Sequence, residues 1–434
     1  MKKKYMQFCV LWLIFLFPFS AYAGGEGKVE AGDTAFVLLS AALVMLMTPG
    51  LALFYGGMVR RKNVLGTLMH SFFAIAIVSI QWILLGYSLS FGPDIKGIIG
   101  GLDWIGLNSV GLTPNPDYAP TVPHMAFMIY QAMFAVITPA LISGAIAERM
   151  KFSAYILFVL LWTTVVYDPI AHWVWGTGGW MKNMGVLDFA GGIVVHITSG
   201  ISALAAALFM GKRKNYLKEP MPPHNLPMTV LGAGLLWFGW FGFNAGSALS
   251  SGGLSTSAFV ATHIAAVSAT FIWVVIEWAH RGKPTMFGAA TGSIAGLATI
   301  TPACGFVGPM SALVIGLSAG AVCYLALNAK VKLGYDDSLD AFGVHGVGGI
   351  LGTIGAGFFA SKVINPAGAD GLIFGNPHQL LVQGISILTA MVYSFAVTFL
   401  LLKLLDLAMG LRVSEEDEMV GLDLSQHEES GYTL

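Results

Sequence analysis

Residues 188–200 read DFAGGIVVHITSG, and residues 340–353 read DAFGVHGVGGILGT. Each stretch places one histidine, His196 or His345, inside an apolar and glycine-rich segment, a few residues after an aspartate. An ionisable side chain in the hydrocarbon layer of a membrane is costly, so by default it marks a pathway or a proton relay. Two such segments in one chain predict a paired site.

The composition is that of a protein that crosses a membrane many times. Of the 434 residues, 56% are hydrophobic and 10% are charged, whereas soluble domains carry about 25% charged residues. The net charge of −1 gives no sign of a nucleic-acid partner. The three cysteines, Cys9, Cys304 and Cys323, form neither a metal-binding spacing nor a disulfide framework. We therefore expect no metal site, cofactor or nucleic-acid partner.

The N-terminus has the features of a secretory signal peptide. Three lysines, Lys2 to Lys4, precede the short apolar run CVLWLIFLF, and Ala21-Tyr22-Ala23 has the form of a cleavage site. A retained first helix is the alternative, but the run is short and Pro18 interrupts it. The sequence predicts a signal peptide over residues 1–23 and a mature chain that begins outside a bacterial inner membrane.

The rest of the chain predicts an all-α polytopic membrane protein with eleven transmembrane helices. A span needs about 20 apolar residues, and the run at 286–302 is the shortest of the eleven. The loop at 92–123 is rich in Pro, Asn and Asp, and is expected to be ordered by turns rather than to span. The candidate spans lie near 33–58, 65–91, 124–147, 153–175, 188–210, 227–247, 257–279, 286–302, 307–328, 341–361 and 380–405.

The basic residues indicate the orientation of these spans. With the mature N-terminus in the periplasm, fifteen lysines and arginines fall in the inner segments or flank the last span on that side. The outer segments hold four, which are Lys28, Lys96, Lys182 and Lys362. The tail, residues 412–434, is then expected to be cytoplasmic and regulatory.

Ten of the spans divide into two sets of five, at about 33–210 and 227–361, and the eleventh, at about 380–411, follows them. An odd number of spans in each half makes the halves insert with opposite orientation, which is the inverted-repeat plan of many transporters. Spans five and ten, which carry His196 and His345, hold corresponding places. A pseudo-two-fold axis could therefore bring the histidines together.

Each polar residue has a structural alternative. A single buried histidine is more often satisfied by neighbouring backbone, whereas two at matching repeat positions favour a function. Neutral imidazoles can touch, with one ring nitrogen donating and the other accepting. Asp188 and Asp340 are both expected to cap the helices that follow them. Whether Asp188 also contributes an electrostatic field at a substrate site is left open.

Aromatic residues form the second group of candidates. Trp173, Trp175 and Trp180 lie at the outer end of span four, where a tryptophan belt at the membrane interface is the ordinary explanation. A tryptophan face can also attract a cation. Two further segments combine aromatic and polar residues, at 130–134 (YQAMF) and 239–247 (GWFGFNAGS).

Several long and specific motifs run through the chain. They are TPGLALFYGGMVRRKNV (48–64), GAIAERMKFSA (144–154), DFAGGIVVHITSG (188–200), HNLPM (224–228), GWFGFNAGSA (239–248), GKPT (282–285), ITPACGFVGP (300–309), FGVHGVGGILGT (342–353) and GLRVSEEDEMVGLDLSQH (410–427). These motifs resemble those of ammonium transporters of the Amt/Mep/Rh family. The resemblance runs from about residue 35 to 427, and it implies a transporter domain of residues 24–411 followed by the tail. Trp175 fits the Amt branch rather than the Rh branch.

The resemblance assigns an external ammonium site to Trp175 and Ser247, which would supply a cation–π face and a hydroxyl acceptor. Tyr130 stands where the family commonly has an aromatic residue, usually Phe, and would complete the site with Phe134. Asp188 would hold the architecture of the vestibule and help to stabilise the bound cation.

The resemblance also assigns a gate and a pore. Phe134 and Phe243 would stack as the gate, and His196 and His345 would line the pore as a twin-histidine pair. A bare cation in hydrocarbon is very costly whereas neutral ammonia is not. We therefore expect ammonium to be recruited, deprotonated at the gate and conducted as ammonia, with the proton crossing through the histidines. Intact passage of ammonium is the competing mechanism.

The family further implies a homotrimer in membrane lipid and a PII-type signalling protein that docks at the cytoplasmic face. The ending HEESGYTL departs from the family's commoner tail. An ammonium sensor of the same fold is the alternative function, although sensors of this type usually carry a fused signalling domain. An enzyme is not expected, because the sequence has no nucleophile-and-base arrangement.

Overall fold

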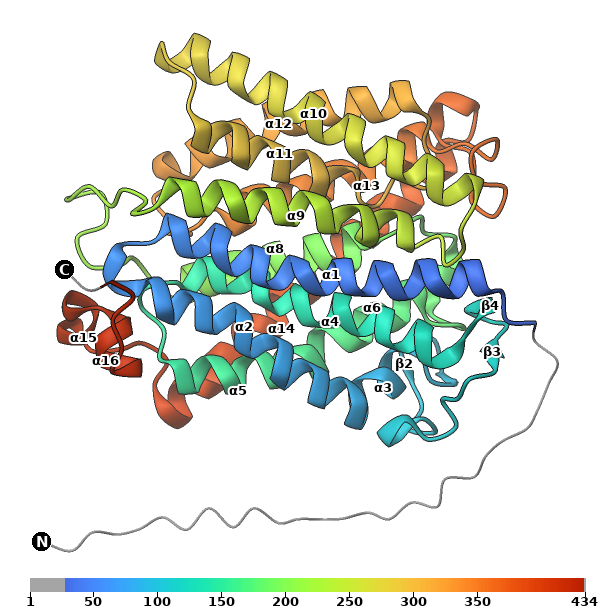
Figure 1. Cartoon of the computed structure of the whole chain (residues 1–434), viewed down its shortest axis with the longest axis horizontal. Coiled ribbons are helices and arrows are strands. Elements are labelled where there is room, and N and C mark those ends of the chain that lie inside the picture. Colours follow the sequence, from blue (N-terminus) through green and yellow to red (C-terminus); the bar gives the residue numbers. More distant parts are fainter. Residues whose placement is uncertain (1–27, 433–434) are drawn as a thin grey trace, which may run out of the picture.

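The computed structural model describes residues 28–432 of the chain (Figure 1). The predicted signal peptide, residues 1–23, lies outside these residues. Within them the fold is almost entirely helical, because a backbone that crosses hydrocarbon must satisfy its own N–H and C=O groups. The α-helices are α1 (Ala31–Met58), α2 (Val64–Gln81), α3 (Tyr87–Phe91), α4 (His124–Ile146), α5 (Phe152–Trp162), α6 (Asp168–Trp175), α7 (Trp180–Met184), α8 (Thr198–Met210), α9 (Leu226–Gly246), α10 (Gly253–Arg281), α11 (Met286–Ile300), α12 (Pro309–Leu333), α13 (Val347–Phe359), α14 (Pro377–Met409), α15 (Glu415–Val420) and α16 (Leu422–His427).

Shorter elements interrupt and connect these helices. Four π-helical turns continue directly into α-helices, and two of them contain the histidines at positions 196 and 345. The π-helical turns are η2 (Trp82–Gly86), η4 (Thr163–Tyr167), η5 (Gly192–Ile197) and η6 (Phe342–Gly346). The 3-10 turns are η1 (Arg61–Asn63), η3 (Ile105–Leu107) and η7 (Leu372–Phe374), and the strands are β1 (Asp94–Ile95), β2 (Ile99–Gly100), β3 (Pro114–Asn115) and β4 (Ala119–Pro123).

The long helices lie side by side in a bundle with two distinct ends (Figure 1). We call them the hairpin end, which holds β1 to β4, and the tail end, which holds α15 and α16. In the described residues, ten helical segments are long and apolar enough to cross a membrane. The predicted span at 286–302 is α11, which has only 15 residues and rises about 22 Å. This is less than the roughly 30 Å of a hydrocarbon core, so the count of eleven spans stays a prediction.

The loop at 92–123 does not span, which confirms the prediction made from its turn-forming residues. It forms two antiparallel hairpins, β1 with β2 and β3 with β4. The hydroxyl of Ser88, in the first turn of α3, donates to the carbonyl of Gly101 at 2.6 Å and ties the first hairpin to the bundle. These hairpins form part of the hairpin end (Figure 1).

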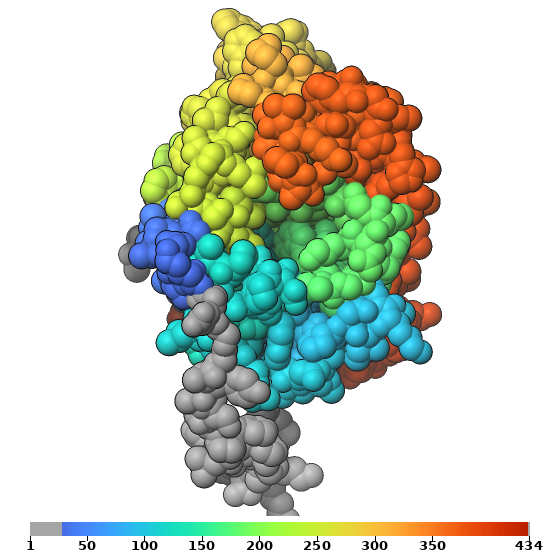
Figure 2. Space-filling view, turned by 90° about the vertical axis from the view of Figure 1, so that its right-hand side faces the viewer, coloured from blue at the N-terminus to red at the C-terminus, as the bar shows by residue number. Residues whose placement is uncertain are grey.

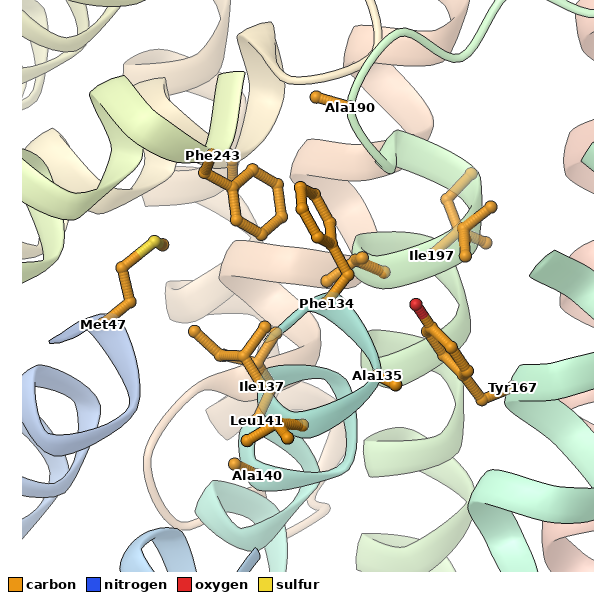
Figure 3. Close-up of a cluster of buried hydrophobic side chains, with 14 of the residues drawn as sticks. Met47, Phe134, Ala135, Ile137, Ala140, Leu141, Tyr167, Ala190, Ile197 and Phe243 are labelled. Atoms are coloured by element: carbon orange, nitrogen blue, oxygen red, sulfur yellow. The ribbon is translucent and has the colours of Figure 1, made fainter. Parts of the chain in front are cut away.

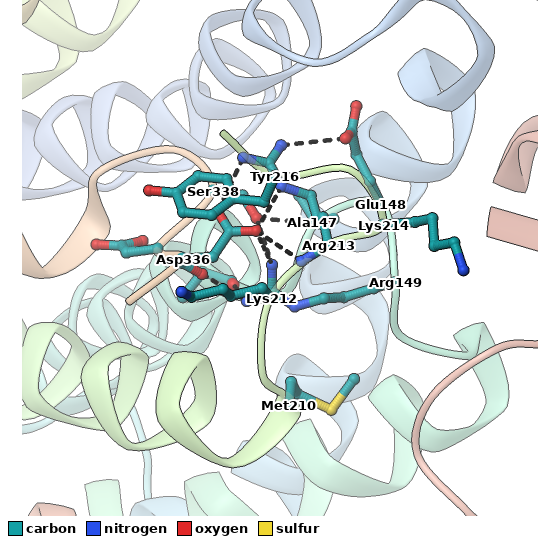
Figure 4. A network of polar contacts seen from close by, with 12 residues as sticks. Ala147, Glu148, Arg149, Met210, Lys212, Arg213, Lys214, Tyr216, Asp336 and Ser338 are labelled. Carbon is teal, nitrogen blue, oxygen red and sulfur yellow. Dashed lines mark hydrogen bonds and ion pairs between the residues drawn. The ribbon is translucent and has the colours of Figure 1, made fainter. Parts of the chain in front are cut away.

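A buried ionic network joins the tail ends of α4, α8 and α12 (Figure 4). Asp336 accepts from Arg149 at 3.1 Å and from Arg213 at 2.9 Å, and Arg213 also reaches Glu148 at 3.1 Å. Burial alone would raise the pKa of Glu148, but Arg213 and Arg60 outweigh it and hold that pKa below its ordinary value. Because the folded-state pKa is lowered, the stabilisation is present above the ordinary pKa and is lost as the pH falls through the folded value.

Candidate functional site

A hollow opens at the hairpin end of the bundle, near the middle of the face seen in Figure 2. It encloses about 150 Å³ and is lined by polar and aromatic side chains from distant parts of the chain. We call this cavity the vestibule. The lining includes Tyr118, Gln131, Phe134, Trp175, Lys182 and Ser247.

A pair of phenylalanines lies at the inner side of the vestibule, which Phe134 lines. The rings of Phe134, from α4, and Phe243, from α9, have centroids 4.3 Å apart and an interplanar angle of 36°. Both side chains are buried, and they face each other in Figure 3. Trp175 meets Phe134 edge-on at 5.8 Å, and its indole N–H donates to the carbonyl of Asp188 at 2.9 Å. The two stacked rings therefore lie between the vestibule, which Phe134 lines, and a second cavity, which Phe243 lines.

Tyr130 stands one turn from Phe134 and binds to α9 through its hydroxyl. The hydroxyl oxygen lies 3.0 Å from the carbonyl oxygen of Gly242, 2.9 Å from that of Phe243 and 3.2 Å from the hydroxyl of Ser247. Ser247 also donates to the carbonyl of Phe243 at 2.9 Å. The hydroxyl proton of Ser247 goes either to the carbonyl of Phe243 or to the hydroxyl of Tyr130, so in both cases it is used within the protein. The serine oxygen is therefore free to accept a hydrogen bond from the vestibule.

Asp188 caps the start of η5, as predicted. One carboxylate oxygen accepts from the backbone N–H groups of Gly191 at 2.9 Å and Gly192 at 2.6 Å. The other accepts from Ile193 at 2.8 Å and Val194 at 3.1 Å. The four free N–H groups at a helix start need acceptors, and this one side chain supplies all of them. Asp188 therefore fixes the backbone whose carbonyl accepts from Trp175. The same backbone carries His196 eight residues later.

His196 and His345 meet on the side of the phenylalanine pair that faces away from the vestibule. The Nδ1 atoms of His196 and His345 are 3.3 Å apart, and their rings are inclined at 22°. This distance allows one Nδ1 to donate and the other to accept. On its other side, the Nε2 of His196 lies 3.3 Å from the hydroxyl of Thr301, which also accepts from the indole N–H of Trp240 at 3.0 Å. The structure thus brings together the pair that the repeat argument predicted.

The space around the histidines is narrow and apolar. A cavity of about 10 Å³ is lined by both rings, by Phe243 and Trp240, and otherwise by aliphatic and aromatic side chains such as Met47 and Ile137. The last two are shown near the phenylalanines in Figure 3. A void of this size holds one water-sized molecule at most, and such a molecule needs polar partners to stay there. Besides the two imidazoles, the indole N–H of Trp240 is the one polar group on the described lining side chains, and it donates to Thr301.

The expectation for Asp340 is wrong. Asp340 forms an ion pair with Lys330, and the cap of η6 is Asp337, whose carboxylate accepts from the backbone N–H of Ala341 at 3.2 Å and of Phe342 at 2.8 Å. Asp340 stands immediately before the helix, but its backbone has φ +62° instead of the extended conformation of a capping residue, and its carboxylate pairs with Lys330. Asp337 precedes its histidine by eight residues, the same spacing as in the other half.

The two capped segments run in opposite directions and cross at glycines. The segment from Asp188 leads from the vestibule towards the tail end, and the segment from Asp337 leads back towards the hairpin end. A methyl group on Gly200 would lie 2.1 Å from the backbone of Gly346, and one on Gly349 would lie 2.9 Å from His196. Only glycine permits this approach, which places the two imidazoles in contact. These two segments thus have the opposite directions that the predicted inverted repeat requires.

A sequence model of the Ammonium Transporter Family matches residues 35–432. The chain belongs to the ammonium transporter family. It is 53% identical over 405 residues to the ammonium transporter of Bacillus subtilis, covering 93% of this chain and 99% of that one. The crystal structure of Candida albicans Mep2 superimposes with a TM-score of 0.87 at 35% identity and covers 94% of both chains. A protein described as a sensor Amt protein has a TM-score of 0.83 at 31% identity, covering 91% of this chain and 98% of that one.

Three features of this family member were not singled out from its sequence. Thr301 lies within the quoted motif ITPACGFVGP, and the histidine contact explains the polar residue in that apolar stretch. Gln131 and Lys182 line the vestibule, but nothing in their immediate sequence indicates it. Their proximity to Trp175 arises only from the packing of α4, α6 and α7.

Proposed function

We propose that this chain moves ammonium or ammonia across a bacterial inner membrane. The observation that supports this most directly is the narrow apolar cavity that holds His196 and His345 below the Phe134–Phe243 pair. A hydrated metal cation cannot enter such a space without losing its water, and no ring of charges is present there to replace it. Ammonium can instead lose a proton and continue as a neutral molecule.

The cation is recruited in the vestibule. The face of Trp175 offers a cation–π interaction, and the oxygen of Ser247 accepts an N–H of ammonium. Phe134 closes the inner side of this site. Tyr130 lies behind Ser247 and acts through it rather than by contact. Asp188 contributes its field and holds the backbone of the site, since its own oxygens are occupied by four N–H groups.

Deprotonation takes place where the phenylalanine rings part. Phe134 and Phe243 form the gate, and a cation that moves between them gives up water on both sides. The N–H bond of ammonium breaks and the proton goes to an imidazole nitrogen of the histidine pair, whose Nδ1 atoms are in contact and whose His196 Nε2 faces Thr301. Neutral ammonia then follows through the apolar cavity. For each nitrogen that crosses as ammonia, one proton thus crosses separately.

Flux distinguishes this function from that of a sensor. Purified protein in proteoliposomes is expected to give a current when ammonium is added on the vestibule side, together with uptake of ammonia. An ammonium sensor of the same fold, which the likeness to a sensor Amt protein keeps in consideration, would bind ammonium without either signal. Binding without flux would therefore replace transport by sensing as the function of this chain.

Replacing Tyr130 by phenylalanine is expected to weaken ammonium recruitment while the gate stays intact. The ring of Tyr130 and its edge-on contact with Phe134 at 5.0 Å remain, but Ser247 loses its hydroxyl neighbour. The half-saturating ammonium concentration should rise about threefold to tenfold, in line with one hydrogen bond of about 1 kcal/mol, with an unchanged maximal current. An unaltered half-saturating concentration would show that Tyr130 only packs.

The tail, residues 412–434, is proposed to be a cytoplasmic regulatory segment. It lies folded against the loops of the tail end (Figure 1). Glu418 accepts from Arg412 at 2.8 Å and from the backbone of Lys214 at 2.5 Å, and Asp423 accepts from the backbone of Gly66 at 2.8 Å. Near the end of the chain, the hydroxyl of Tyr432 lies 2.9 Å from Nε2 of His224. The tail therefore connects the start of α2 to the loop between α8 and α9.

A PII-type signalling protein is the proposed partner of this surface. Full-length protein is expected to retain a PII protein in a pull-down, whereas protein that ends at residue 411 should lose it, because the loop at 212–220 is then no longer held by the tail. A Lys362→Gln variant, changed at the opposite end, serves as the matched control. Equal retention with and without the tail would remove the tail from the docking surface.

The membrane arrangement is proposed on the same basis. The hairpin end faces the periplasm with the mature N-terminus, and the tail end faces the cytoplasm, as the distribution of lysine and arginine predicts. The chain works as a homotrimer in lipid, as the family implies. Residues 1–23 act as a signal peptide that is removed.

A further inference from the structure

The vestibule contains a positive charge of its own. Lys182 lies on α7 and lines the same cavity as Trp175 and Ser247. Its Nζ donates to the backbone carbonyl of Trp175 at 3.0 Å and stands 5.5 Å from the centroid of the Tyr118 ring. A lysine head group is itself an ammonium ion with three N–H donors. Here it uses one aromatic face and one oxygen acceptor, the same two kinds of group that are proposed for the substrate.

Within the described part of the chain this charge has no ion-pair partner, although the carboxylate of Asp117 is near enough to interact with it. Among residues 28–432, the ion pairs do not include Lys182. Asp117 lines the cavity without pairing with it, and the oxygens of Asp188 are taken by four backbone N–H groups. The side chain is exposed, so its charge faces the water through which an arriving cation must pass.

We propose that Lys182 sets the affinity of the vestibule for cations by electrostatic repulsion. The proposal rests on the proposed transport function and names a further residue that tunes the same site. A fixed positive charge beside Trp175 raises the ammonium concentration needed to fill the recruitment site, and it disfavours a second cation in the cavity. Like charges repel more weakly as salt increases, since the Debye length is about 10 Å at 0.1 M. The effect must therefore depend on ionic strength.

A purely structural role predicts something different. Lys182 could serve only to hold the Trp175 carbonyl, and hence the loop between α6 and α7. Glutamine at this position keeps an N–H donor for that carbonyl but has no charge, whereas arginine keeps both. The two substitutions separate the charge from the hydrogen bond. Lys362, an exposed lysine on the loop after α13, does not line the vestibule and offers a matched control.

The test measures half-saturating ammonium concentrations from currents on a supported membrane, at low and at high sodium chloride. Lys182→Gln is expected to lower this concentration about fivefold at low salt, the size of the repulsion between two unit charges a few Å apart in water. The difference should shrink at high salt. Lys182→Arg and Lys362→Gln should both resemble the unchanged protein.

Two results would overturn the inference. An equal half-saturating concentration for Lys182→Gln and the unchanged protein would show that the charge has no influence. An equal shift for Lys182→Arg and Lys182→Gln would assign the effect to local structure. If the unchanged protein gives no ammonium-elicited current at all, the proposed function fails and this inference with it, whereas the first two results leave transport in place.

Discussion

Replacing His196 by aspartate is expected to let potassium pass as well as ammonium. The imidazole lines the narrow cavity and stacks 5.9 Å from Phe243. A carboxylate at the same place is smaller, attracts cations and brings water with it, so a cation no longer needs to lose a proton to cross. Potassium-elicited current on a supported membrane, absent in the unchanged protein, should appear. The selectivity for ammonium should fall accordingly.

His345→Ala tests the same point from the other half of the repeat. It removes the second imidazole, 3.3 Å from the first, and interrupts the proton path while leaving His196 in place. Ammonia flux should continue, and the ammonium-elicited current should fall relative to it. His378→Ala, on the exposed start of α14, is the control. If neither pore variant conducts potassium or changes the ratio of current to flux, proton separation through the histidines is contradicted.

Replacing Asp188 by alanine is expected to cause the largest loss of stability. Four backbone N–H groups would lose their acceptor in a buried place, and each unsatisfied group costs about 1–3 kcal/mol. The start of η5 would shift, and with it the Trp175 contact and His196. We expect a sharply lower yield, a lower melting temperature in detergent and no ammonium-elicited current.

Asp340→Ala is the matched control for this prediction. Both aspartates precede a histidine-containing segment, but among residues 28–432 the side chain of Asp340 pairs only with Lys330, at the partly exposed tail end. Its loss should leave the melting temperature and the current close to normal. Asp337→Ala should instead behave like Asp188→Ala, with a smaller effect, because Asp337 accepts from two N–H groups. A normal melting temperature for Asp188→Ala would contradict the role assigned to this cap.

The sequence alone was sufficient for much of the fold. Hydropathy located the apolar segments, and the matching places of His196 and His345 predicted that two inverted halves would bring them together. The prediction that Asp340 caps the following helix failed because hydropathy does not show in which direction a side chain points. The equal spacing of eight residues, from Asp188 to His196 and from Asp337 to His345, was a sequence signal that could have identified the correct cap.

The walls of the vestibule were harder to predict. Tyr130 was expected beside the substrate, but its hydroxyl turns towards α9 and reaches Ser247. Lys182 was counted only as one of four basic residues of the outer segments, and its place beside Trp175 depends on the turn between α6 and α7. Such contacts join segments far apart in the sequence, and no local pattern reports them.

The most direct test of separate proton passage compares ammonium-elicited currents in H₂O and D₂O. A step in which a proton moves between heavy atoms slows on deuteration, whereas an intact ion slows only with the viscosity of the solvent. H₂O buffer adjusted with glycerol to the viscosity of D₂O provides the reference. The account predicts a current in D₂O well below that reference. A current equal to the reference would contradict it and favour passage of intact ammonium.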